Sequence, residues 1–67
     1  MIKNDVELDT TFQRISWFQQ QLAHLRNTEK SPTNYHAAAK GFISEIDRMQ
    51  LQVREYLSTP AIVAGVG

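Results

Sequence analysis

Apolar side chains recur at heptad spacing through the second half of the chain, and this pattern most constrains the fold. Between residues 35 and 56 the steps alternate between four and three residues without a break. An α-helix places side chains at such positions on one stripe, and a stripe this regular packs against another helix. The residues on it are Tyr35, Ala39, Phe42, Ile46, Met49, Val53 and Tyr56.

The first half of the chain repeats the pattern. The residues that share the spacing are Leu8, Ile15, Phe18, Leu22 and Leu25, with Thr11 in the one missing position and Phe12 beside it. Asn4 precedes Glu7 by three residues, a variant of the capping box that starts helices. No glycine or proline interrupts residues 5–30. We therefore predict a first helix over about 5–30, preceded by a loose end at residues 1–3.

A polar stretch at residues 27–31 separates the two patterns. Ser31 followed by Pro32 is a strong start signal, because the hydroxyl can cap and proline at the first helical position loses no hydrogen bond. The second helix is predicted over 32–57, before Pro60. Gly41 inside it costs about 1 kcal/mol relative to alanine. It either permits a close helix approach beside small neighbours or is simply tolerated.

These elements predict an all-α fold, an antiparallel helical hairpin over residues 1–58 followed by an apolar tail over 59–67. The tail is expected to be flexible, with packing on a partner or pairing as a strand as the alternative. Phe12, Ile43 and Leu57 flank the two apolar stripes and widen them. Two helices alone can therefore cover only part of this apolar surface. We therefore expect self-association into a four-helix bundle, as a homodimer or a higher even oligomer. The expected interface residues are Leu8, Ile15, Phe18, Leu22, Leu25, Tyr35, Phe42, Ile46, Met49, Val53 and Tyr56.

Composition narrows the function classes. With 67 residues the chain is one small domain, a size that usually needs an additional stabilising device. It has no cysteine, so disulfides and thiolate metal sites are excluded. Seven basic and seven acidic side chains cancel, which argues against a nucleic-acid or anionic-membrane partner. The polar start is unlike a signal peptide, and no apolar run is long enough to span a bilayer, so a cytoplasmic protein is expected.

The sequence contains no recognisable catalytic, metal-binding or phosphate-binding motif. His24 and His36 have no histidine or glutamate three or four residues away on the same helix, so neither metal nor cofactor is expected. The serines lack the glycines of a nucleophile elbow, and phosphate-binding loops are absent. Glu45 and Arg48 are spaced for an ordinary surface ion pair. We predict a protein without enzymatic activity or a small-molecule ligand; an active site shared between chains is the least favoured hypothesis.

Trp17 lies off the stripe of the first helix, on the side that also carries Val6. Tryptophan is enriched at interface hot spots, so the two residues are a possible face for a protein partner. The alternative is a half-buried residue at the rim, with its ring lying over its own helix. Both interpretations stay open at the level of sequence.

The chain resembles the N-terminal helical hairpin of bacterial antitoxins of the host-inhibition-of-growth type over about residues 1–57. The resemblance rests on the start at residues 1–4, on Phe18, Leu22 and Leu25, on the Ser31-Pro32 restart, and on Ile46, Met49 and the Arg54-Glu55-Tyr56 ending. Those antitoxins continue into a DNA-binding helix-turn-helix domain that 67 residues cannot hold, so the resemblance implies dimerisation or toxin binding but no repression. The preferred prediction is a small oligomerisation and protein-interaction module, and the alternative is an antitoxin-like regulatory protein.

Overall fold

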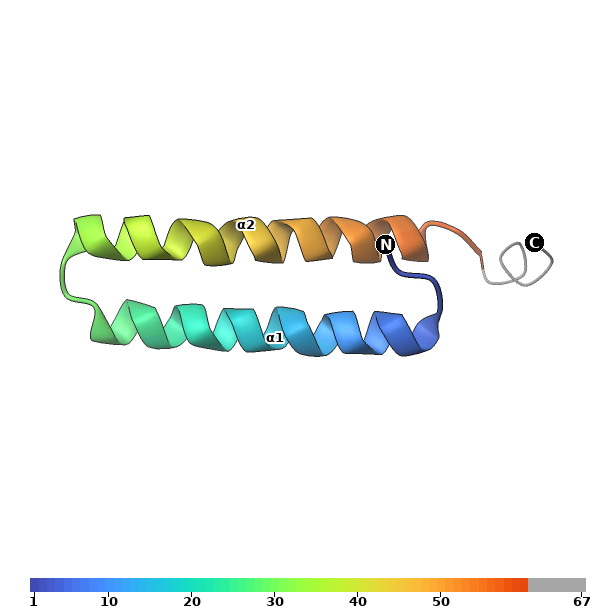
Figure 1. Ribbon diagram of the computed structural model, residues 1–67, viewed down its shortest axis with the longest axis horizontal. Helices are drawn as coiled ribbons and strands as arrows, with labels where there is room; N and C mark the ends of the chain where they lie inside the picture. Colours follow the sequence, from blue (N-terminus) through green and yellow to red (C-terminus); the bar gives the residue numbers. More distant parts are fainter. Residues whose placement is uncertain (61–67) are drawn as a thin grey trace.

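The computed structural model describes residues 1–60, which form two α-helices joined by a short connection. Helix α1 spans Asp5–Thr28 and helix α2 spans Pro32–Leu57. They run antiparallel along their whole length as a hairpin (Figure 1). The predicted all-α hairpin is therefore confirmed. Residues 61–67, most of the predicted tail, lie outside the described residues.

Side chains cap the start of α1 largely as the sequence predicted. The Asn4 side-chain oxygen accepts a hydrogen bond from the Glu7 backbone N–H at 2.9 Å. The Glu7 carboxylate accepts in return from the backbone N–H of Lys3 at 2.8 Å. In the usual capping box the donor is the N–H of the cap residue itself, which here is Asn4. Each bond satisfies a backbone donor that the helix itself cannot pair.

Helix α1 ends at Thr28, two residues earlier than predicted. Glu29 and Ser31 both have extended backbones, with ψ of 117° and 119°. Ser31 precedes Pro32, whose ring disfavours helical geometry in the residue before it. The Glu29 carboxylate accepts from the Ser31 backbone N–H at 3.1 Å and holds this turn. The Ser31 hydroxyl caps α2 by accepting from the Asn34 N–H at 3.4 Å.

The second helix has the predicted bounds and contains Gly41 without distortion. The Ser58 hydroxyl donates to the Arg54 carbonyl oxygen at 2.6 Å where the helix ends, before Pro60. A Cβ built on Gly41 would meet no atom within 4 Å. Within the hairpin, Gly41 therefore makes no close approach, and the small residue at the helix contact is Ala39, which is 2% exposed.

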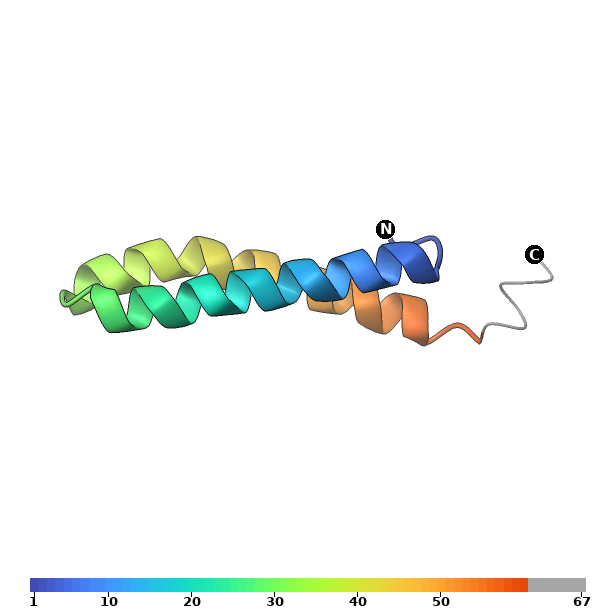
Figure 2. The same cartoon turned by 90° about the horizontal axis from the view of Figure 1, so that it is seen from below.

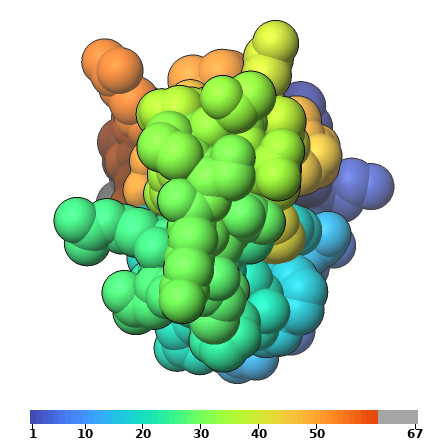
Figure 3. All heavy atoms as spheres, turned by 90° about the vertical axis from the view of Figure 1, so that its left-hand side faces the viewer, coloured from blue at the N-terminus to red at the C-terminus, as the bar shows by residue number. Residues whose placement is uncertain are grey.

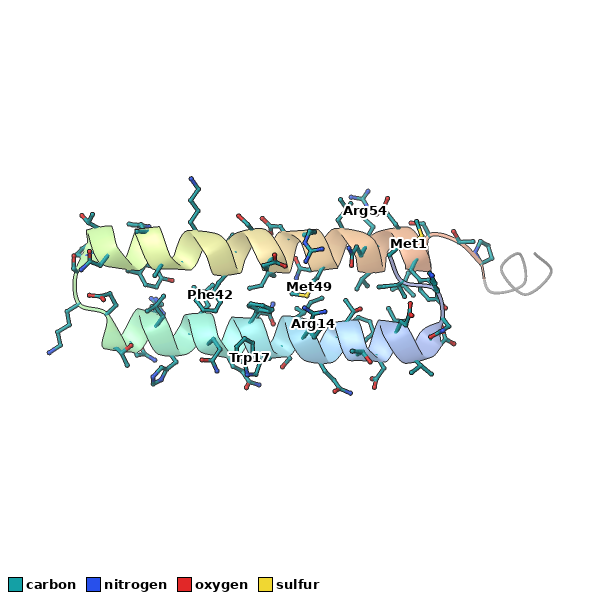
Figure 4. The ribbon with its side chains drawn as sticks, viewed as in Figure 1. Met1, Arg14, Trp17, Phe42, Met49 and Arg54 are labelled. Atoms are coloured by element: carbon teal, nitrogen blue, oxygen red, sulfur yellow. The ribbon has the colours of Figure 1, made fainter. Side chains whose placement is uncertain are left out.

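The apolar stripes face each other, and the contact between them is thin. Ala39, Ile46 and Met49 of α2 are buried, whereas no residue of α1 is. The Phe18 and Phe42 rings meet edge to face with centroids 5.8 Å apart. Figure 4 shows Phe42 and Met49 between the helices and Arg54 projecting away from them. The other stripe residues of both helices are half-buried.

The N-terminal residues 1–3 are not a loose end, and that prediction was wrong. The chain doubles back before α1, so that Met1 lies beside the C-terminal end of α2 (Figures 1 and 4). Ile2 is only 8% exposed and is one of four buried apolar residues within the described part of the chain. Burying its side chain and bonding the Lys3 N–H to Glu7 offset the entropy lost by fixing the segment.

The hairpin is only two helices thick. Figure 2 shows α1 and α2 crossing near their middles, which keeps the two stripes in contact along the pair. Seen from the connecting end, the helices stack one above the other (Figure 3). No third element within residues 1–60 covers either side of the pair. The stripes are therefore shielded only by each other.

Candidate interaction surfaces

The open end of the hairpin is closed by one hydrogen bond between the two helices. The Tyr56 hydroxyl, near the end of α2, donates to a carboxylate oxygen of Asp5, the first residue of α1, at 2.7 Å. The two residues are 51 positions apart in sequence, and this is the most long-range side-chain hydrogen bond among the described residues. It fixes the register of the helices at the end opposite to the connection.

This hydrogen bond raises the pKa of Tyr56 above the ordinary tyrosine value of 10.0. The main cause is that the phenol donates its proton to Asp5, a bond that is lost when the phenol ionises. Smaller contributions come from desolvation and from the negative charge of Asp5, which disfavours a tyrosinate beside it. The phenol therefore keeps its proton at neutral pH, and the hydrogen bond is lost when the phenol ionises in alkali.

A groove of about 670 Å³ lies beside this hydrogen bond at the open end. The N-terminal residues form one side and the last turns of α2 form the other. Its apolar lining comes from Met1, Ile2, Leu57 and Pro60. Sequence reasoning missed this feature, because Met1 and Ile2 lie outside any periodic pattern and the residue directly before the Asn4 cap is the polar Lys3.

Trp17 is half-exposed, at 54%, and lies outside the space between the helices (Figure 4). Its ring meets the Phe18 ring edge to face at 5.1 Å. A shallow groove of about 330 Å³ beside it is lined by Thr10, Gln13, Arg14 and Phe18. Val6 is exposed, but about three helical turns away along α1. The two residues share a side of the helix without forming one compact patch.

All the predicted interface residues lie on the facing stripes. Ile46 and Met49 are buried, and the remaining nine are half-buried: Leu8, Ile15, Phe18, Leu22, Leu25, Tyr35, Phe42, Val53 and Tyr56. Inside one chain they therefore serve as the contact between α1 and α2.

The charged side chains and the histidines are dispersed over the two helices. Glu45 and Arg48 form the predicted ion pair at 2.6 Å, exposed on α2. His24 and His36 are both exposed, on different helices. No group of three or more potential metal ligands occurs within residues 1–60. Neither of the two described helices is both long and apolar enough to cross a bilayer.

Comparison with known proteins yields no relative. No family model matches the chain, and neither curated proteins nor solved structures show significant similarity to it. The resemblance to the antitoxin hairpin therefore stays a prediction that rests on the residues quoted for it.

Proposed function

We propose that this chain is a small non-enzymatic interaction module whose hairpins associate through their apolar stripes into a four-helix bundle. The supporting observation is the thinness of its core: four apolar residues of the described chain are buried, and none of them belongs to α1. A module this small has little core with which to offset the entropy of folding. A second hairpin would supply the missing burial.

The exposed apolar side chains support the same proposal. Phe12, Ile43 and Leu57, which flank the stripes, are each about half-exposed or more. Scattered single apolar residues are ordinary on a protein surface, but large ones on both helices of a two-helix chain are typical of an association surface. The chain has no net charge, so copies do not repel one another overall.

Light scattering on the full chain at micromolar concentration tests the proposal. Because the chain has a mass of 7.7 kDa, association gives twice or four times that value. A helical protein that stays at 7.7 kDa throughout the micromolar range would contradict it.

The outer side of α1 around Trp17 is a second surface in this proposal, available to a different protein. Its half-exposed indole and shallow polar-rimmed groove suit a partner that inserts an apolar side chain. Replacing Trp17 by alanine should leave the light-scattering mass unchanged, because Trp17 lies outside the stripes. If Trp17→Ala abolished self-association, the indole would belong to the self-association surface and not to a separate partner surface.

A further inference from the structure

The two broad faces of the hairpin differ in chemistry, and the difference follows from helical geometry. Successive residues turn by about 100°, so residues seven apart form a row that flanks the central stripe. The register is fixed by Phe18 lying opposite Phe42 and Asp5 lying opposite Tyr56. With this register, each face of the hairpin carries one flanking row from α1 and one from α2.

One face is polar beside the stripes. Its α1 row contains Glu7, Arg14 and Gln21, and its α2 row contains Glu45 and Gln52. Arg14 is visible on this face, which is turned toward the viewer in Figure 4. Polar and charged side chains along both edges of a stripe mark the side that stays in water.

The opposite face carries Phe12 and Ile43 near its centre, each beside a glutamine of the other helix. The α1 row is Asp5, Phe12, Gln19 and Arg26, and the α2 row is His36, Ile43, Gln50 and Leu57. Phe12 and Ile43 are each 46% exposed, about a quarter-turn from the centres of their stripes. Leu8, Ile15 and Val53 lie half-buried between these rows. We name this surface the Phe12/Ile43 face.

We propose that a second copy of this chain docks on the Phe12/Ile43 face, which gives the self-association proposed above a defined surface. The area of this face suits such a partner. A helix of 24 residues is about 36 Å long and two adjacent helices are about 20 Å wide, which gives a face of about 700 Å². Each partner of a stable interface contributes roughly 800 Å².

The charges at the rim of this face suit a second copy. The α1 row begins with an acid, Asp5, and ends with a base, Arg26, with uncharged side chains between them. Two copies related by a two-fold axis perpendicular to the helices place each Asp5 opposite the Arg26 of the other copy. The same arrangement places Phe12 of each copy opposite Gln19 of the other copy.

Sedimentation equilibrium of matched variants tests this surface. Phe12→Lys and Ile43→Lys each put a charge at the centre of the face and should raise the dissociation constant at least tenfold. Trp17→Lys and Leu51→Lys put the same charge on half-exposed apolar residues elsewhere and should leave it within about threefold. Loss of association in the control pair, with the first pair unaffected, would overturn the proposal.

The fluorescence of Trp17, the only tryptophan, provides a second readout that needs no substitution. In the associated protein at high concentration, acrylamide should quench this fluorescence readily, because Trp17 is half-exposed and lies away from the Phe12/Ile43 face. An indole shielded from the quencher would place Trp17 inside the interface and contradict the proposal. A wild-type protein that is monomeric at all concentrations would instead refute the function proposed above, so the two failures are distinguishable.

Discussion

A pH titration of Tyr56 tests its hydrogen bond to Asp5 separately from the other contacts of the hairpin. Because donation to Asp5 raises the pKa of Tyr56 in the folded state, the stability from this contact is fully present below the ordinary pKa. It is lost as the pH rises through the raised value. In a Tyr35→Phe background, the absorbance of the one remaining tyrosinate should therefore titrate above pH 10.0.

The matched control for this titration is Asp5→Ala in the same background. Removing the carboxylate removes the acceptor, so the midpoint should fall to the ordinary tyrosine value, about 10. Identical midpoints in the two proteins would mean that the hydrogen bond closing the open end does not form in solution.

Ile2 should contribute measurably to stability although it stands near the chain terminus. Ile2→Ala removes most of a side chain that is 8% exposed, and should lower the free energy of unfolding by about 1–2 kcal/mol. Val6→Ala, at a position that is 77% exposed, should change it by less than about 0.5 kcal/mol. Urea denaturation of both variants compares the two losses, and equal losses would show that the N-terminal segment does not pack on α2.

At the level of the helices, Gly41 offers a gain in stability. Since nothing lies within 4 Å of its missing Cβ, alanine fits without strain and should stabilise the protein by up to about 1 kcal/mol. Ala37→Gly, at an exposed position one turn earlier, should lower stability by a similar amount. Thermal melts of the two variants should move in opposite directions. Destabilisation by Gly41→Ala would reveal a neighbour that approaches this position closely.

The two helices were largely predictable from sequence, because heptad spacing and capping residues are local features of the chain. Heptad spacing predicted both helices, and the Ser31-Pro32 pair located the start of α2 to the residue. The end of α1 was placed two residues too late because the extended backbone of Glu29 depends on the turn geometry before Pro32. Residues 1–3 were misjudged because an apolar pair outside any periodic pattern packs according to tertiary position.

The candidate surfaces were less predictable than the helices. Sequence placed Trp17 off the stripe, as the structure confirms, but the groove at the open end depends on two segments 50 residues apart. Which flanking rows share a face also depends on the antiparallel register, and the Phe18–Phe42 contact provides it. Periodicity within one helix carries no information about that register.

For the whole molecule, the stripe should be far more sensitive to charge than the outer surface. Ile46→Asp places an unpaired carboxylate at a buried position and should destabilise the protein by at least about 3 kcal/mol, dissociating or unfolding it. Lys40→Ala, at an exposed position of the same helix, should have little effect. Far-UV circular dichroism during thermal unfolding measures both, and similar melting temperatures would show that the stripe is wrongly assigned.

The central claim is that one hairpin buries too little apolar surface to be stable alone, so folding is coupled to association. The melting temperature of the wild-type chain as a function of its concentration tests this most directly. Mass action requires the melting temperature to rise with concentration when only the associated state is stable. We predict an increase of several degrees between 1 and 100 micromolar, on the order expected for coupled association. A folded protein that remains a 7.7 kDa monomer in solution, with a melting temperature independent of concentration, would contradict this claim.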